Sequence, residues 1–335
     1  MNKIKGVLIG CGFFAENQMY AWQDLGIDIV GVYDTSFDKA KHFEKKFDTR
    51  AYHDIDTMLK ECYPLFVDIV TPSNTHLDII KQIVKYDVNI ICQKPFAEDM
   101  DEILQMIDMT KDTSLVIHEN FRYQKPFVVA KEMIEQGDIG ELFYAHLSFR
   151  SGFDVYKAQP YLATIDRFTL MDIGSHLFDL ARYLCGEVEE LNCLTQRVNK
   201  KIKAEDTFYA SLKHKNGIIS NVDCSYYTTI DPDPFPLTIA TFEGSKGSIK
   251  IDTSYTLTLT TKENQVTQNI RPETPRWGDK DFSLVQDSVI SFQRNYIEAL
   301  TSNTTPATYA IDNKKTMELV FAAYKSAEEQ RRIKL

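Results

Sequence analysis

The sequence predicts a two-domain chain, in which an α/β domain with a doubly wound parallel sheet precedes an α+β domain with a mainly antiparallel sheet. Two observations carry this prediction. Up to about residue 120, short apolar runs alternate with segments of helical periodicity. Beyond residue 122, strand-like segments follow one another through turns such as Lys215-Asn216-Gly217. We therefore expect domains over residues 1–121 and 122–335, with the last helix packing back toward the first domain.

The first domain opens with a strand, a glycine turn and a helix. Ile4–Ile9 is an apolar run of buried-strand type, and the segment that follows the turn has apolar residues at helical spacing (Ala15, Met19, Trp22 and Leu25). In a dinucleotide-binding turn, the first glycine permits a tight bend, the second lets backbone amides approach a pyrophosphate, and a small third residue allows close packing of helix on strand. The sequence therefore predicts a dinucleotide at the helix N-terminus, bound by Gly10, Gly12, Phe13, Phe14 and Ala15.

The second predicted strand, Ile27–Tyr33, ends at Asp34. An acidic residue at about this distance from the glycine turn typically bonds the ribose hydroxyls of the adenosine. Its charge would repel a 2′-phosphate, which favours NAD over NADP. The alternative is a glycine turn in a nucleotide-free α/β protein, with Asp34 a polar residue at a strand end. Because the strand, turn, helix, second strand and acid occur in order, cofactor binding is favoured.

The rest of the first domain continues the alternation. The remaining predicted elements are strands at Phe66–Val70, Asn89–Cys92 and Leu115–His118, and helices at Asp38–Phe47, Ile55–Glu61, Thr75–Tyr86 and Asp99–Lys111. Ligands of such sheets bind beyond the carboxyl ends of the strands. The polar residues that follow the three strands are therefore expected at the edge that holds the glycine turn, and we assign these to the cofactor: Thr71, Pro72, Asn74 and His76; Gln93 and Lys94; and Asn120.

The second domain is predicted from a series of strands and three helices. The strands are Leu142–Phe149, Glu189–Gln196, Thr207–Leu212, Ile218–Ser225, Leu237–Phe242, Ser248–Ile251 and Tyr255–Thr260, and the helices are Leu170–Leu184, Ser283–Leu300 and Asp312–Gln330. A sheet with one helix layer leaves a face to be covered. Aromatic residues are expected to cover it through a subunit contact in a homodimer or homotetramer, or else to pack the domain's own core: Phe208, Tyr226, Tyr227 and Phe242.

The predicted helix at Leu170–Leu184 carries the second chemical signal. Asp172, His176, Asp179 and Tyr183 follow 4-3-4 spacing and share one face. An ordinary solvent-facing stripe would hold Lys, Glu or Gln. Asp172 as a helix-start carboxylate and His176 as a structural histidine are the plain alternatives.

Lys94 is a further candidate for a catalytic group, because Pro95 holds it extended at a strand end. Its plain alternative is a solvated lysine. Oxidation of an alcohol by NAD requires a base that takes the hydroxyl proton as hydride leaves carbon. A desolvated lysine, a carboxylate-oriented histidine, or both can serve. We therefore expect Lys94 to converge with Asp172 and His176.

Composition excludes several classes of partner. The chain has 335 residues and a formal net charge of −10, which argues against nucleic acid as a partner, since phosphate binding needs clustered Lys and Arg. No apolar run has the length of a signal or a membrane span, so no membrane partner and a cytoplasmic location are expected. The six cysteines show no metal-binding spacing, so buried reduced thiols and no metal site are expected.

Taken together, these motifs resemble the glucose-fructose oxidoreductase, inositol dehydrogenase and rhizopine-catabolism (Gfo/Idh/MocA) family over essentially the whole chain. The motifs are the glycine turn, Thr71-Pro72 through His76, Lys94-Pro95 and Asp172 with His176. The resemblance implies a Rossmann domain, an open-faced antiparallel domain that forms dimers or tetramers, and a sugar or polyol substrate. It also implies that His176 is the proton acceptor, that Lys94 bonds the reacting hydroxyl and shares in proton transfer, and that Asp172 orients the substrate.

More narrowly, four segments resemble the D-apiose dehydrogenase-like members of that family, which oxidise an aldopentose at its anomeric carbon to a lactone. The segments are Gly10–Ala15, Cys92–Phe96, His118–Arg122 and Ser148–Gly152. Polar residues near the start of the second domain are candidate sugar contacts: Arg122, Tyr123, Arg150, Asp154, Tyr156 and Arg167. For Arg122 and Arg150, a structural ion pair is the equal alternative.

One position departs from the family, whose Glu-Lys-Pro motif is here Gln93-Lys94-Pro95. The missing carboxylate removes a charge that would favour the lysine ammonium. Two further functions stay open: an inositol or cyclic-polyol dehydrogenase that yields a ketone, and a dinucleotide-binding sensor without catalysis.

Overall fold

The computed structural model describes residues 4–335, and the chain divides into two compact units. Of the described residues, unit 1 holds residues 4–119 and Val289–Lys315, and unit 2 holds Asn120–Ser288 and Thr316–Leu335. The first division lies close to the predicted boundary. Residues 289–315, which the prediction placed in the second domain, belong to unit 1.

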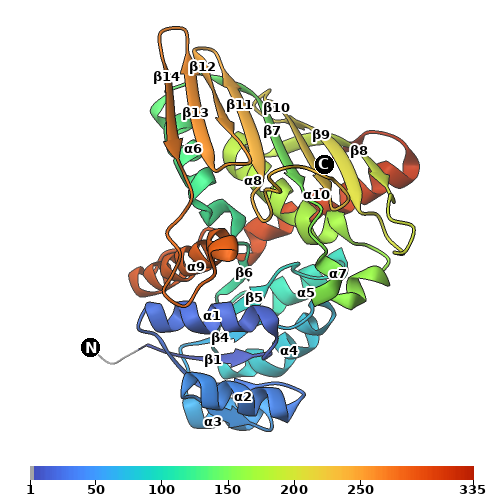
Figure 1. Cartoon of the computed structure of the whole chain (residues 1–335). Coiled ribbons are helices and arrows are strands. Elements are labelled where there is room, and N and C mark those ends of the chain that lie inside the picture. Colours follow the sequence, from blue (N-terminus) through green and yellow to red (C-terminus); the bar gives the residue numbers. More distant parts are fainter. Residues whose placement is uncertain (1–3) are drawn as a thin grey trace. The chain divides into compact units, whose positions relative to one another are not determined.

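Unit 1 is built on a six-stranded parallel sheet in the order β3-β2-β1-β4-β5-β6 (Figure 1). Its strands are β1 Lys5–Ile9, β2 Asp28–Tyr33, β3 Arg50–Tyr52, β4 Phe66–Ile69, β5 Asn89–Gln93 and β6 Leu115–His118. Its helices before β6 are α1 Phe13–Asp24, α2 Phe37–Phe47, α3 Ile55–Cys62, α4 His76–Ile83 and α5 Met100–Met109, with short 3-10 turns η1 Ser73–Thr75 and η2 Val84–Tyr86. The predicted doubly wound parallel sheet is confirmed.

The local sequence explains where these elements lie. The apolar residues of β1 are buried, as expected for a parallel strand covered on both faces. Asp54 caps α3 by accepting from the backbone amide of Thr57 at 2.7 Å, and Asp99 caps α5 by accepting from the amide of Glu102 at 2.9 Å.

Helix α9, Ser283–Ser302, brings the late segment of the chain into unit 1. The Tyr296 ring contacts the rings of Trp22 and Phe66, with centroids 6.5 and 5.7 Å apart. The Thr308 hydroxyl donates to the Ile117 carbonyl at 2.7 Å. Burial of these aromatic surfaces explains why residues 289–315 pack with the first unit.

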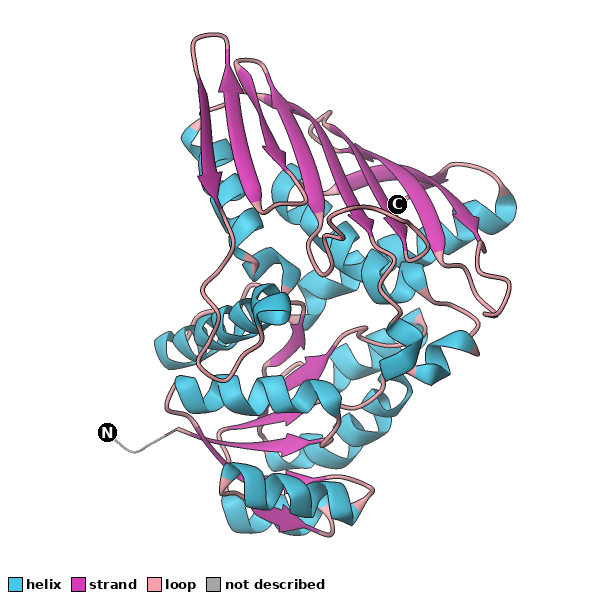
Figure 2. Cartoon of the chain, viewed as in Figure 1, coloured by secondary structure: helices cyan, strands magenta, loops and turns pink. Residues whose placement is uncertain are grey.

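Unit 2 is built on a nine-stranded sheet in the order β14-β13-β12-β11-β7-β10-β9-β8-β15 (Figure 2). All of its neighbouring strands are antiparallel except β7 and β10. Its strands are β7 Leu142–Arg150, β8 Val188–Gln196, β9 Thr207–His214, β10 Ile219–Ser225, β11 Ile239–Gly244, β12 Gly247–Ile251, β13 Thr256–Thr261, β14 Gln265–Asn269 and β15 Ile333–Lys334. The predicted mainly antiparallel second sheet is confirmed.

The described helices of unit 2 lie on one side of this sheet (Figure 2). They are α6 Lys125–Gln136, α7 Val155–Ala158, α8 Ser175–Cys185 and the later part of α10 Ala310–Glu329, with short turns η3 Phe121–Tyr123, η4 Pro160–Ala163 and η6 Lys280–Phe282 and a π-helical turn η5 Leu170–Gly174. Helix α8 contacts β7 and β10. Among residues 4–335, no helix lies over the outer face of the sheet (Figures 1 and 2).

The aromatic residues proposed for a subunit contact divide between the core and the surface. Phe208, Tyr226 and Phe242 are buried in the core of unit 2, as in the alternative interpretation. Tyr227 is 60% exposed. The subunit interpretation therefore fails for three of the four.

Five α-helices and strands of the described residues escaped prediction: β3, α6, α7, β14 and β15. Strand β3 has only three residues, and β14, which is exposed along its whole length, has no apolar alternation. Helix α6 begins at Lys125-Pro126, where proline fits the first helical turn rather than ending a helix.

All six cysteines are free, and five are buried, with Cys62 half-buried. In the part of the chain from residue 4 onward, the helices lack the combination of length and apolar character needed to cross a bilayer.

Candidate active site

The carboxyl ends of the unit 1 strands meet at one edge of the parallel sheet. Ile9 pairs with Tyr33 and with Ile69, and Gln93 pairs with His118. The loops after these strands therefore share this edge, as expected from the sequence. The strand order reverses between β1 and β4, and such a switch point is where doubly wound sheets bind nucleotides.

Gly10 and Gly12 shape the turn after β1. Gly10 has φ +99°, and a Cβ atom there would lie 2.5 Å from the Val70 carbonyl oxygen. Another residue would clash in a backbone conformation that L-residues avoid. A Cβ on Gly12 would meet nothing within 4 Å, so open space lies beside the start of α1. This fits the approach of a pyrophosphate to the helix amides.

The rest of the turn agrees with that use. Ala15 is fully buried where α1 packs on the sheet, while Phe13 is 72% exposed. The Phe14 ring meets His118 edge-on, with centroids 6.0 Å apart. Burial, reinforced by the charge of Asp34, raises the pKa of Cys11 to about 12 and keeps this thiol protonated.

Asp34 is held beside the glycine turn at the end of β2. Its two carboxylate oxygens accept from the backbone amides of Cys11 and Ser36, each at 2.8 Å. These bonds fix the carboxylate next to the turn. The position fits the predicted contact with ribose hydroxyls.

The loop after β4 contains a histidine that links two loops. His76 is fully buried, and its ring nitrogens lie 3.0 Å from the Phe96 carbonyl and 2.9 Å from the Thr71 carbonyl. Burial lowers the pKa of His76, although the two carbonyls act in the opposite sense. His76 thus holds Thr71 and the segment after Pro95, while Pro72 and Asn74 are exposed. Its predicted cofactor contact stays a prediction.

Lys94 follows directly on β5. Gln93 is buried, and its side-chain carbonyl accepts from the backbone amide of Lys94 at 2.9 Å. The Lys94 side chain is half-buried. Its predicted contact with the cofactor and its predicted role toward a substrate hydroxyl stay predictions.

Asn120, the cofactor candidate that follows β6, belongs to unit 2. It is buried, and its side-chain amide donates to the Ser288 hydroxyl at 2.7 Å.

His176 lies at the start of α8 in unit 2. It is 3% exposed, and its ring stacks on Phe121, with centroids 3.7 Å apart and planes within 1°. Asp172 is half-buried in the π-helical turn before it, and such turns are frequent at functional sites. Burial, together with the charge of Asp172, raises the pKa of Tyr161.

Asp179, on the predicted polar stripe, forms a buried ion pair. The guanidinium of Arg122 bonds both of its oxygens, at 2.7 and 2.5 Å. Arg182 lies 3.9 Å from the same carboxylate, and the Thr316 hydroxyl donates to it at 3.0 Å. This ion pair is the alternative that the sequence offered for Arg122, and its predicted sugar contact stays a prediction.

Arg150 also takes part in an ion pair. It lies on the outer face of the sheet and bonds Asp223 at 2.7 Å, as do Ser148 at 2.7 Å and His146 at 3.0 Å. Burial would raise the pKa of Asp223, but these partners outweigh it and lower the pKa. The predicted sugar contact of Arg150 stays a prediction.

The other sugar candidates are spread over the start of unit 2. Asp154 is exposed, 3.8 Å from Lys157, and Arg167 lies over the Tyr324 ring at 4.9 Å. Tyr123 is half-buried in η3. Tyr156 is half-buried against Phe168, and burial raises its pKa to about 12. Their contact with a sugar stays a prediction.

Comparison with known proteins agrees with these features. Residues 4–121 match the model of an oxidoreductase family with an NAD-binding Rossmann fold, and residues 127–250 match the GFO/IDH/MocA C-terminal domain. The chain belongs to the Gfo/Idh/MocA oxidoreductase family. The resemblance stated from the sequence is therefore confirmed, as is the prediction of an enzyme.

Two D-apiose dehydrogenases and one solved structure are similar to this chain over nearly its whole length. It is 39% identical to the D-apiose dehydrogenase of Rhizobium rhizogenes, over 99% of this chain and 98% of the relative. It is 36% identical to that of Paraburkholderia graminis, over 100% and 90%. An oxidoreductase from Agrobacterium radiobacter, solved with NAD+, L-tartaric acid and magnesium, superposes with a TM-score of 0.97 at 38% identity, covering 99% of this chain and 98% of that one.

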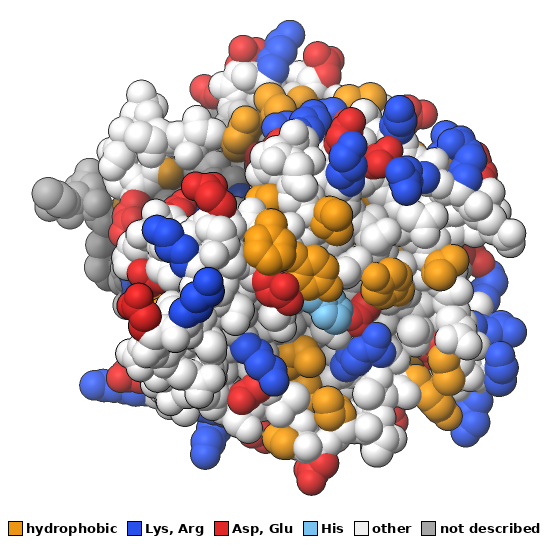
Figure 3. Space-filling model, turned by 90° about the horizontal axis from the view of Figure 1, so that it is seen from above, with side chains coloured by type: hydrophobic (Ala, Val, Ile, Leu, Met, Phe, Trp, Pro, Cys, Tyr) orange, Lys and Arg blue, Asp and Glu red, His pale blue; other side chains and the backbone are white. Residues whose placement is uncertain are grey.

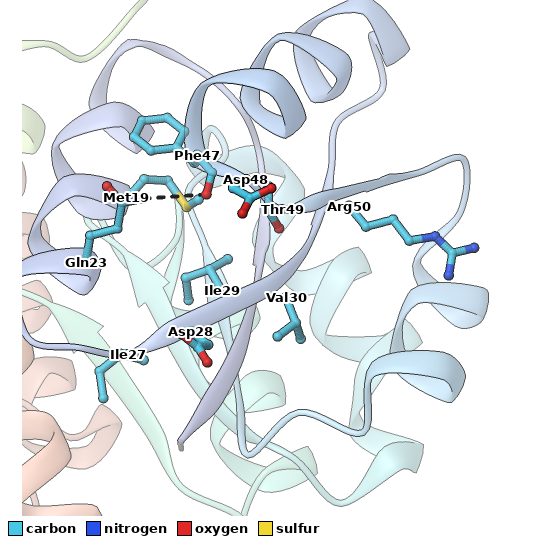
Figure 4. A pocket seen from close by; sticks show the side chains of 10 residues that line it. All are labelled: Met19, Gln23, Ile27, Asp28, Ile29, Val30, Phe47, Asp48, Thr49 and Arg50. Atoms are coloured by element: carbon cyan, nitrogen blue, oxygen red, sulfur yellow. Dashed lines mark hydrogen bonds between the residues drawn. The ribbon is translucent and has the colours of Figure 1, made fainter. Parts of the chain in front are cut away.

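A separate hollow of about 440 Å³ lies at the opposite end of the parallel sheet (Figure 4). It is flanked by the start of β2 and by the segment before β3. Its lining residues are Met19, Gln23, Ile27, Asp28, Ile29, Val30, Phe47, Asp48, Thr49 and Arg50. The candidate cofactor-binding residues of unit 1 lie beyond the carboxyl ends of the strands, whereas the hollow lies at their amino ends. We therefore do not assign the hollow to the reaction.

Glu205, which supports the segment before α8, was not predicted from the sequence. The Glu205 carboxylate accepts from the backbone amides of Phe168 and Leu170 at 3.2 and 3.1 Å and from the Tyr324 hydroxyl at 2.8 Å. These bonds hold the start of the segment that carries Asp172. A single acidic residue in a polar loop gave no signal for this role.

Proposed function

We propose that the chain catalyses the NAD-dependent oxidation of an aldopentose, D-apiose, at its anomeric hydroxyl to give the lactone. The observation that carries the proposal is full-length similarity to two D-apiose dehydrogenases, at 39% and 36% identity. The nucleotide-binding edge of unit 1 and the Asp172-His176 segment of unit 2 supply the groups that this reaction needs.

The residues of unit 1 suit a dinucleotide. The amides at the start of α1 suit the pyrophosphate, and the fixed carboxylate of Asp34 suits the ribose hydroxyls. NAD, when bound, accepts a hydride. The fit of Asp34 to an unphosphorylated ribose supports a preference for NAD over NADP.

In the proposed reaction, three residues act on the cyclic hemiacetal. His176 takes the proton of the anomeric hydroxyl as the C–H bond gives its electron pair to the cofactor as hydride, and the C–O bond becomes the carbonyl of the lactone. Lys94 hydrogen-bonds the reacting oxygen and shares in the proton transfer. Asp172 accepts hydrogen bonds from the sugar and orients it.

A substitution at Asp34 tests the cofactor preference. Asp34→Ala removes both the ribose acceptor and the repulsion of a 2′-phosphate, so the ratio of kcat/KM with NAD to that with NADP is expected to fall about tenfold. The measurement is initial rates with each cofactor at saturating sugar. Asp38→Ala, on exposed α2, is the matched control and should keep the wild-type ratio. An unchanged ratio in Asp34→Ala would refute the ribose role.

A substrate screen tests the proposed function. Purified protein is incubated with NAD or NADP and with aldoses, polyols or inositols, and the reduced cofactor and the products are measured. Lactone from D-apiose supports the proposal. A ketone from an inositol or another polyol would replace it with a polyol dehydrogenase. NAD binding without reduction by any of these substrates would favour a sensor.

Self-association through the sheet of unit 2 belongs to the same proposal. Its outer face exposes Leu194, Tyr209 and Ile219, at 61%, 43% and 53%. In the view from above, hydrophobic side chains gather near the middle of a polar and charged surface (Figure 3). A dimer or tetramer would cover them. Light scattering that gives the mass of a single chain would contradict this.

Six free thiols fit a cytoplasmic location.

A further inference from the structure

A buried carboxylate in unit 1 has no part in the mechanism above. Asp68, on β4, is fully buried, and Trp22, Phe66 and Tyr296 are buried around it. Its oxygen Oδ2 accepts from Trp22 Nε1 at 2.9 Å. Burial raises the pKa of Asp68 to about 7, and the indole donor acts in the opposite sense. A carboxylate in such surroundings is costly unless other donors reach it.

Those donors come from Gln18 on α1. With the Gln18 amide oriented so that each donor meets an acceptor, its nitrogen donates to both oxygens of Asp68, at 2.9 Å to Oδ1. Its oxygen then accepts from Gln93 Nε2 at 3.0 Å. The Gln93 oxygen in turn accepts from the backbone amide of Lys94 at 2.9 Å. An unbroken series of hydrogen bonds thus runs from Asp68 to Lys94.

The direction of every bond in this series is set at its two ends. An ionised carboxylate accepts only, so Gln18 must turn its nitrogen toward Asp68 and its oxygen toward position 93. The Lys94 amide donates only, so position 93 must turn an acceptor toward it. Position 93 therefore needs a donor on one side and an acceptor on the other. Glutamine satisfies both sides, whereas an ionised glutamate would face the Gln18 oxygen with a second acceptor.

We propose that Asp68, through Gln18 and Gln93, is a positioning residue that fixes the backbone at Lys94, and that it is the reason why position 93 is glutamine in this chain. In the family's Glu-Lys-Pro motif a carboxylate stands next to the lysine. In this chain the carboxylate is that of Asp68, and the Gln18 and Gln93 side chains lie between it and Lys94. The role of Asp68 in catalysis rests on the proposed function of Lys94, but the hydrogen-bond series does not.

The proposal predicts that two damaging substitutions compensate each other. In Asp68→Asn, the oxygen of the new amide accepts from Trp22, and its nitrogen takes the place of Oδ1, opposite the Gln18 nitrogen. Two donors then face each other there, or, when the Gln18 amide reverses, farther along the series. In Gln93→Glu, two acceptors face each other at Gln18. In the double variant the two bonds of the Gln18 amide reverse together, while Trp22 and the Lys94 amide keep donating, because the carboxylate introduced at position 93 accepts from both Gln18 and the Lys94 amide. The charge moves from position 68 to position 93.

The experiment compares the wild type, the two single variants and the double variant at about pH 8, where an ordinary carboxyl is ionised. Hydrogen exchange at the Lys94 backbone amide and the midpoint of thermal unfolding need no substrate. Each single variant is expected to speed exchange at Lys94 about tenfold and to lower the midpoint by a few degrees, and the double variant to recover most of both. With D-apiose, kcat is expected to fall about tenfold in each single variant and to recover in the double.

The outcomes separate the two proposals. If the losses of the single variants add up in the double variant, or if the single variants exchange at Lys94 like the wild type, the hydrogen-bond series is refuted whatever the protein oxidises. If exchange and unfolding show compensation but no sugar is oxidised, the series stands and the proposed function fails. If exchange shows compensation while kcat is the same in all four proteins, the positioning role of Asp68 is refuted.

Discussion

Replacing Lys94 with methionine is expected to lower kcat for sugar oxidation by about a thousandfold, within the range of about 10² to 10⁴ that general acid–base groups contribute. Methionine keeps an unbranched side chain but cannot donate a hydrogen bond or share a proton. The hydrogen bond between the Lys94 backbone amide and Gln93 is independent of the side chain. The Kd for NAD, measured by fluorescence titration, should therefore stay close to that of the wild type.

The matched control is Lys111→Met, which replaces an exposed lysine of unit 1 that lies beyond the end of α5. It should keep wild-type turnover. Wild-type kcat in Lys94→Met would remove Lys94 from the mechanism, and a large loss of NAD affinity would show that the lysine holds the cofactor instead.

His176→Ala is expected to abolish turnover to a similar extent, because the proposed proton acceptor is removed. The histidine is buried and stacks on Phe121, so alanine also leaves a gap between packed residues. A second variant, His176→Gln, fills more of that space without an imidazole. Both variants should lose turnover while NAD affinity is kept, and His176→Gln should unfold at a higher temperature than His176→Ala.

This pair of variants separates chemistry from packing. If His176→Gln recovers both stability and wild-type turnover, the histidine is structural and the assigned mechanism is wrong. His42→Ala, at an exposed position on α2, is the control for histidine loss and should leave kcat unchanged.

The sequence was most informative where backbone geometry demands a particular residue. Only glycine suits position 10, where φ is +99° and a Cβ atom would press on Val70. The apolar runs of the parallel strands and the polar residues that follow them then placed Asp34, Thr71 and Lys94 at one sheet edge. These features depend on neighbours in the sequence and on sheet topology, which periodicity can predict.

Side-chain partners from distant segments could not be predicted in this way. Arg122 meets Asp179 across 57 residues, and Trp22 meets Asp68 across 46. Nothing in the spacing of these residues selects one partner over another. Both Arg122 and Arg150 turned out to be bound by buried carboxylates, the alternative that the sequence had left open.

Of the points where the chain passes from one unit to the other, only the first, after Glu119, was predictable from the sequence. A change from alternating strands and helices to successive strands marks that point. The return of residues 289–315 to unit 1 depends on the contacts of Phe292 and Tyr296, and an amphipathic helix does not show in its own sequence which sheet it will cover.

Hydride transfer from the anomeric carbon is the central claim, and it is tested most directly with D-apiose that carries deuterium at that carbon. The protein is incubated with this sugar and NAD, and the reduced cofactor and the product are examined by mass spectrometry. We expect one deuterium in the nicotinamide of each reduced cofactor and an equal amount of lactone. Reduced cofactor without deuterium, or a ketone that retains the label, would contradict the account.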